Sequence, residues 1–186
     1  MCEIYRFRDE LGRLNAWKRH SRDRVDEFDL ICNLQLEKSS ITTVCASKDS
    51  NCAIKVYIQI KSGFIYLYEF NEKEFKLLEK IPCGTFTFCK MSVLRLEDAI
   101  LLAFPDDKVE NSISLINDSE KRTFLLKGFT QGSSNGMCLF SKLFRYPTSE
   151  FLLLCGFENG RLVILRFNSR DEYEVAFDER IFEDSC

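Results

Sequence analysis

FLLLCGFENGRLVILRF, residues 151–167, consists of two apolar runs on either side of the dipeptide Asn159-Gly160. Asn and Gly both tolerate a positive φ, so this dipeptide between apolar runs is a strong signal for a tight β-hairpin. The first run, Phe151 to Gly156, is almost continuously apolar, which is typical of a strand buried on both faces. The stretch therefore predicts two paired strands inside a buried sheet.

The same unit of apolar run, turn and second run recurs along the chain. One copy turns at Gly12 and ends at Trp17, another turns at Gly63 and continues through Tyr68, and a degraded copy at residues 99–116 has a charged loop without glycine. The second runs begin near residues 12, 63, 111 and 160. This spacing of about 50 residues matches the roughly 40–50 residues of a four-stranded propeller blade. We expect Gly12, Trp17, Gly63, Tyr68, Gly156 and Gly160 to be structural positions of the repeat.

Further β-rich runs complete these units. Runs precede the three later hairpins at residues 41–46, 85–91 and 137–144, and runs follow all four at 28–36, 75–81, 123–126 and 173–177. The first unit has no preceding run. A β-sandwich also has evenly spaced hairpins, but without a self-similar 50-residue unit, so the propeller is favoured. The prediction is an all-β propeller segment of about four blades, at about residues 1–37, 38–82, 83–127 and 128–178, with an acidic tail at 179–186.

Composition and charge exclude several classes of protein. With 45% hydrophobic residues, the chain is too apolar to be disordered. A net charge of −3 offers no general attraction to nucleic acid or to an anionic membrane. The apolar runs fall far short of the roughly 20 residues that a spanning helix needs, and the first ten residues resemble no signal peptide. We expect no membrane and no nucleic-acid partner.

The nine cysteines favour reduced thiols in a protein of the nucleus or cytoplasm. Their number is odd and no secretory signal precedes them, which argues against a disulfide framework. No pair has the C-x-x-C spacing of a zinc site, and His20 is the only histidine. We therefore expect no metal and no cofactor.

Residues that could carry catalysis are scarce. His20 lies in the basic segment Lys18–Arg24, which we expect to be a polar, solvated loop with nearby acidic neighbours. The glycine-rich residues 132–136 lack the lysine of a phosphate loop. The acidic stretch at residues 171–184 is interpreted as a solvated edge, with a docking strip for a basic partner as the alternative. The sequence predicts no catalytic residue and no small-molecule substrate.

The hairpins resemble WD40 repeats. Residues 152–165 match the family's strand, glycine-containing turn and following strand, and residues 8–18 match the same segment and keep its tryptophan at Trp17. Lys18 stands where the family has the aspartate of its Trp-Asp pair, and no unit has a Gly-His start. The resemblance therefore implies a divergent WD40-like propeller without the usual hydrogen-bonded tetrad.

A narrower resemblance covers roughly residues 5–167. It is to the WD-repeat family of ASTRA-associated protein 1 and guanine nucleotide-binding protein subunit beta-like protein 1. The matching segments, in order along the chain, are Arg8-Asp9 with Leu14 and Trp17, Thr85–Cys89, Leu101–Pro105, Gly136–Leu139 and Leu153–Gly160. Their shared order and spacing carry the resemblance.

The resemblance implies a non-enzymatic scaffold for protein–protein interaction. Its members work with the Tel2–Tti1–Tti2 co-chaperone system in the maturation of PI3-kinase-related kinases, and with chromatin-linked assemblies. Two alternatives stay open: an unrelated WD-repeat adaptor of another complex and, less favoured by the residues present, a propeller enzyme. A closed ring of seven blades needs about 300 residues. We therefore expect the 186 residues to form a partial or truncated propeller with exposed sheet edges and poor solubility as a monomer.

Overall fold

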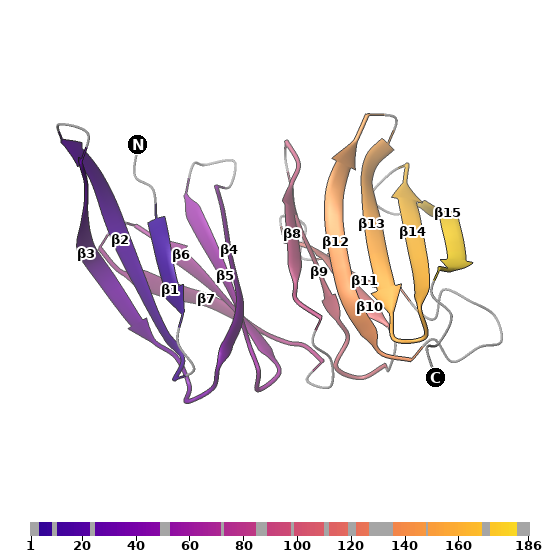
Figure 1. The fold of residues 1–186 in the computed structure, drawn as a ribbon, viewed down its shortest axis with the longest axis horizontal. Helices are drawn as coiled ribbons and strands as arrows, with labels where there is room; N and C mark the ends of the chain where they lie inside the picture. The colour runs from indigo at the N-terminus through magenta and orange to yellow at the C-terminus, as the bar shows by residue number, and fades with distance from the viewer. Residues whose placement is uncertain are drawn as a thin grey trace. The chain divides into compact units, whose positions relative to one another are not determined.

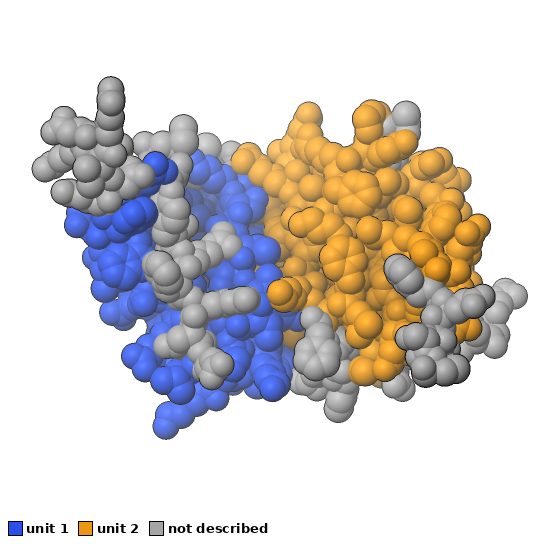
Figure 2. Space-filling view, viewed as in Figure 1, with its two compact units in different colours: residues 1–81 blue, residues 82–186 orange. Residues whose placement is uncertain are grey.

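The fold is seen in a computed structural model, shown in Figure 1. It describes residues 4–8, 11–22, 25–48, 53–71, 73–84, 89–97, 99–109, 112–118, 122–126, 136–147, 149–168 and 172–181. Over these residues the regular secondary structure consists of fifteen β-strands in four antiparallel sheets, which confirms the predicted all-β class. None of the described residues forms a helix long and apolar enough to cross a membrane. The chain divides into two compact units, residues 1–81 and 82–186 (Figure 2).

The first unit contains two sheets in which consecutive strands are neighbours. The first sheet has three strands, β1 (Ile4–Arg8), β2 (Arg13–Arg22) and β3 (Val25–Gln35). The second has four, β4 (Ile41–Lys48), β5 (Ile54–Ile60), β6 (Phe64–Phe70) and β7 (Phe75–Pro82). This up-and-down order is what short turns between successive strands produce.

Side chains at alternate strand positions build the core of the first unit. Leu14 and Ala16 of β2 belong to the same buried cluster as Val56, Ile58 and Ile60 of β5. Successive side chains of a strand point to opposite faces, so this spacing of two residues places these side chains on the face of each sheet that adjoins the cluster. The two sheets are thus held together by burial of apolar surface, each large side chain contributing about 1.5–3 kcal/mol.

The second unit also contains two sheets with neighbouring consecutive strands. The third sheet has β8 (Ser92–Arg95), β9 (Ile100–Pro105), β10 (Ile113–Asn117) and β11 (Arg122–Leu126). The fourth has β12 (Cys138–Tyr146), β13 (Ser149–Phe157), β14 (Arg161–Phe167) and β15 (Tyr173–Arg180). The hairpin predicted at Asn159-Gly160 joins β13 to β14.

The core of the second unit lies between its two sheets. Leu101 and Leu115 of the third sheet cluster with Leu153 and Leu165 of the fourth. The rings of Phe151 and Phe167, which face each other across β13 and β14, stack with centroids 4.3 Å apart. The strands β13 and β14 of the fourth sheet are therefore fully buried on this face.

The β9–β10 connection shows how a turn forms without the glycine of the other copies. One carboxylate oxygen of Asp106 accepts hydrogen bonds from the backbone N–H groups of Lys108 (2.9 Å) and Val109 (2.8 Å). The other accepts from the Ser114 hydroxyl (2.6 Å). These bonds hold the pKa of Asp106 below its ordinary value although burial alone would raise it. The Asp106 carboxylate thus stabilises this loop through hydrogen bonds, whereas the other copies have a glycine in the turn.

Three expectations need correction. Residues 18–22 are not loop but part of β2, in register with β3 so that Lys18 lies opposite Asp29 and His20 opposite Glu27. Strand β15 continues to Arg180, so residues 179 and 180 are strand and not acidic tail. A strand was expected at 85–91, but the structure has β8 at Ser92–Arg95, and residues 85–88 lie outside the described part. The four sheets span residues 4–35, 41–82, 92–126 and 138–180, and the blade boundaries given above stay predictions.

Candidate functional site

The residues expected to mark the repeat lie in three different sheets and form no single site. Gly12, Gly63 and Gly160 occupy hairpin turns with φ of 78°, 88° and 77°, a region that favours glycine. Gly156 lies within β13, Trp17 within β2 and Tyr68 within β6. Their role as repeat positions stays a prediction.

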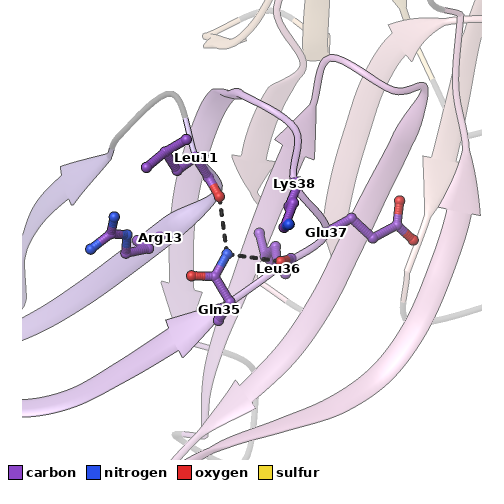
Figure 3. Close-up of a pocket in the computed structure, with 6 residues that line it drawn as sticks. All are labelled: Leu11, Arg13, Gln35, Leu36, Glu37 and Lys38. Atoms are coloured by element: carbon purple, nitrogen blue, oxygen red, sulfur yellow. Dashed lines mark hydrogen bonds between the residues drawn. The ribbon is translucent and has the colours of Figure 1, made fainter.

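A pocket of about 730 Å³ lies in the first unit, beside the turn that begins β2. The turn residue Leu11, strand residues of β2 and β3, and the segment that leaves β3 form its wall (Figure 3). Its lining residues are Leu11, Arg13, Gln35, Leu36, Glu37 and Lys38. The Gln35 side-chain amide donates to the carbonyl oxygens of both Leu11 and Leu36, each at 3.0 Å, which fixes the two sides of the wall to each other.

At Gly12, the turn before β2 lies very close to the backbone of the segment after β3. A Cβ at this position would lie 2.4 Å from the carbonyl oxygen of Glu37 and 3.0 Å from that of Ser39. The backbone N–H of Leu36 donates to the Gly12 carbonyl oxygen at 3.0 Å. The turn before β2 can therefore lie directly against the segment after β3 only because Gly12 has no side chain.

The carboxylate of Glu37 is held by two donors from the second sheet. The Tyr66 hydroxyl donates to it at 2.5 Å and the Lys80 ammonium at 2.6 Å. The Lys80 nitrogen also lies 3.8 Å from the centre of the Phe64 ring, a cation–π contact. The hydrogen bonds from Lys80 and Tyr66 lower the pKa of Glu37, and the bond to Glu37 raises the pKa of Lys80.

Lys38 gives the pocket wall an exposed positive charge. Figure 3 shows the Glu37 carboxylate pointing away from Leu11 and Gln35, and its charge is matched by Lys80. Arg13 and Lys38 are exposed lining residues. A carboxylate or another anion is the group that such a wall attracts.

Sequence reasoning did not single out the Glu37 cluster. Glu37 is 29 residues from Tyr66 and 43 from Lys80, and the chain has 26 Lys and Arg residues with 29 Asp and Glu. No local pattern selects these partners from so many charges. The lone glycine at Gly12 was the one signal that pointed to this region.

Three thiols meet inside the second unit. The sulfur atoms of Cys89 and Cys138 are 3.9 Å apart, and Cys89 also lies 3.4 Å from the Ser141 hydroxyl. Cys155 belongs to the same buried cluster. The contact with Cys138 and burial raise the pKa of Cys89, and the pKa of Cys138 is raised by its contact with Cys155 and by burial. Cys89 and Cys138 are therefore protonated core residues of low nucleophilicity.

The acidic strand β15 is partly neutralised by the strand beside it. Asp178 forms an ion pair with Arg161, and Glu174 pairs with Arg166 at 3.0 Å. Residue 171 and residues 182–184 of the predicted acidic stretch, and residues 185–186 of the predicted acidic tail, lie outside the described residues. Over the described part of the chain, no group of three or more His, Cys, Asp or Glu side chains has the geometry of a metal site.

Comparisons with known proteins identify the fold. No protein-family model matches the chain, and no curated protein matches it. The WD40 domain of SCAP from fission yeast is similar over 93% of this chain and 44% of its own length, with 10% identity and a TM-score of 0.55. Two further structures have a TM-score of 0.49. BBS1N in complex with ARL6DN has 11% identity over 94% of this chain and 51% of its own length. Nup170 NTD in the Nup53 complex of Chaetomium thermophilum has 9% identity over 96% of this chain and 29% of its own length.

The chain spans less than half the length of the SCAP domain. The four antiparallel sheets and this similarity confirm the predicted fold. The chain has a WD40-like β-propeller fold in which four blade sheets are present.

Proposed function

We propose that this chain is a non-enzymatic scaffold for protein–protein interaction. One observation supports this most directly: large apolar side chains are exposed on the last strand of three sheets. They are Phe28 and Leu30 on β3, Leu77 and Leu78 on β7, and Tyr173 and Val175 on β15. Adjacent exposed apolar residues of this kind are typical of protein contact surfaces.

The finer proposal follows the family resemblance. The chain works with the Tel2–Tti1–Tti2 system, in the nucleus or cytoplasm, and joins chromatin-linked assemblies. Affinity purification of the tagged chain followed by mass spectrometry tests this, and we expect Tel2 and Tti components among the enriched proteins. Enrichment of a different complex without them would favour an unrelated WD-repeat adaptor.

The pocket supplies a proposed contact for the partner. Its exposed Lys38 suits an acidic side chain of the bound protein. Lys38→Glu should reduce partner recovery severalfold and make the remaining binding less sensitive to salt. Lys73→Glu, an exposed lysine of the β6–β7 turn, is the matched control and should leave recovery unchanged.

The scaffold proposal and the enzyme alternative make different predictions for His20. His20 lies on β2 opposite Glu27 of β3, so we propose that its role is structural. His20→Asn should leave partner recovery and any function in cells intact. Loss of function with full partner recovery would favour an enzyme.

A further inference from the structure

The pocket beside the turn that begins β2 is a shallow groove on the first unit. Its volume of about 730 Å³ lies within the usual range of ligand sites. Apart from Leu36, every side chain that lines it is exposed. A small-molecule site buries most of its ligand and is lined mainly by apolar side chains. A groove with these exposed and mostly polar side chains therefore fits a segment of another protein better.

The groove offers an apolar, a charged and a hydrogen-bonding contact. Leu11 is 55% exposed and presents an apolar side chain. The exposed Lys38 presents an ammonium group, and Figure 3 shows Leu11 and Lys38 on either side of the Gln35 amide. The amide nitrogen of Gln35 donates to the carbonyl oxygens of Leu11 and Leu36, which leaves the amide oxygen as an acceptor for a peptide N–H.

Glu37, the neighbour of Lys38 in the chain, does not cancel its positive charge. The Glu37 carboxylate accepts from the Tyr66 hydroxyl at 2.5 Å and from the Lys80 ammonium at 2.6 Å. It points away from Leu11 and Gln35 (Figure 3). Over the described ranges of the chain, Lys38 forms no ion pair. Lys80 thus neutralises Glu37 and leaves the charge of Lys38 to the groove.

The wall of the groove is held in place by contacts within the first unit. Gln35 links the backbone of Leu11 to that of Leu36. The Leu36 N–H donates to the Gly12 carbonyl oxygen at 3.0 Å, and Glu37 is tied to the second sheet. A site that is already formed loses less conformational entropy when a ligand binds.

We infer that this groove binds an extended segment of a partner protein in which an acidic residue stands next to an apolar one. Successive side chains of an extended segment point to opposite sides, so the acidic side chain meets Lys38 and the apolar one meets Leu11. A backbone N–H of the segment donates to the Gln35 amide oxygen. The inference rests on the scaffold function proposed above and adds the chemistry of the segment that the scaffold recognises.

Fluorescence anisotropy of the full chain with a fluorescein-labelled peptide of alternating Glu and Leu residues tests this inference. A short peptide on an exposed groove should bind weakly, with a dissociation constant of about 100 μM. The matched peptide with Gln in place of Glu should bind about tenfold more weakly, and so should the peptide with Ser in place of Leu. Binding of the Glu-containing peptide should weaken as salt is added.

Substitutions in the chain assign the binding to the groove. Lys38→Glu and Leu11→Ser should each raise the dissociation constant about tenfold. Lys80→Met should raise it about threefold although Lys80 does not line the groove, because the Glu37 carboxylate then loses its partner and competes for Lys38. Lys73→Glu, in the β6–β7 turn, is the control and should change the constant less than about twofold. Circular dichroism of each variant separates lost binding from a lost fold.

The results distinguish this inference from the scaffold proposal. Equal binding of the Glu and Gln peptides, binding that ignores Lys38→Glu, or no binding at about 0.5 mM chain overturns the inference. Peptide binding without enrichment of any complex by the tagged chain would support the groove and overturn the scaffold. Enrichment of a complex that depends on neither Lys38 nor Leu11 would keep the scaffold and overturn the groove.

Discussion

Replacing Gly12 by alanine should destabilise the first unit by about 2–3 kcal/mol. A φ of 78° costs a residue with a Cβ about 1–2 kcal/mol. The added Cβ would also lie 2.4 Å from a backbone oxygen of Glu37, so one of the two segments must move. That movement weakens the 3.0 Å hydrogen bond from Leu36 to the Gly12 carbonyl, which contributes about another 1 kcal/mol.

The chain supplies its own probe for this measurement. Trp17 is the single tryptophan and lies on β2, the strand that Gly12 precedes. Urea unfolding followed by Trp17 fluorescence should show the transition of the Gly12→Ala variant at a clearly lower urea concentration, with the slope unchanged. Far-UV circular dichroism follows the sheets of both units in the same samples.

Substitutions at two other glycines separate the cost of the positive φ from the cost of the close contact with the Glu37 backbone. Gly160 has a positive φ of 77°, so Gly160→Ala should cost about 1–2 kcal/mol from backbone strain. Gly156 has no positive φ, and its Cβ would meet only the Phe140 Cβ at 3.8 Å, so Gly156→Ala should be neutral or stabilise by up to about 1 kcal/mol. If Gly12→Ala costs no more than Gly160→Ala, the close approach to the Glu37 backbone has no energetic role and the reasoning fails.

Three further measurements test the remaining contacts. Because the pKa of Glu37 is lowered, the stabilising effect of its carboxylate is present above the ordinary carboxyl pKa and is lost as the pH falls through the lowered value. The urea midpoint should therefore drop less between about pH 5 and pH 3 in the Glu37→Gln variant than in the original chain. Asp106→Ala should destabilise the second unit by about 2 kcal/mol, because two backbone N–H groups lose their acceptor, whereas a loss below about 0.5 kcal/mol would show that the loop holds without it. In the folded chain at about pH 8, Cys89 and Cys138 should react with iodoacetamide at least about 100-fold more slowly than the half-buried Cys45. Peptide mass spectrometry measures these rates, and equal rates would contradict the buried thiol cluster.

The hairpins could be predicted because their signals are local. Asn159-Gly160 carries the backbone preference of its turn within two residues, and the apolar runs beside it show the pattern of buried strands. The polar segment at residues 18–22 gave the opposite signal, yet it is strand. Its register sets Lys18 opposite Asp29 and Arg19 opposite Phe28, so pairing with β3 keeps these polar residues in a strand. Polarity alone was therefore a poor guide to where β2 ends.

The sequence by itself determined the repeat, the all-β class and most of the turns, because each of these depends on neighbouring residues. Only the tertiary structure decided which side chains meet at the pocket. Glu37, which follows β3, meets Tyr66 and Lys80 of the second sheet, and only the strand register shows which side chains share a face of the fourth sheet. Such contacts depend on how sheets pack and pair, and the chain has many charged and apolar residues that could have filled the same places.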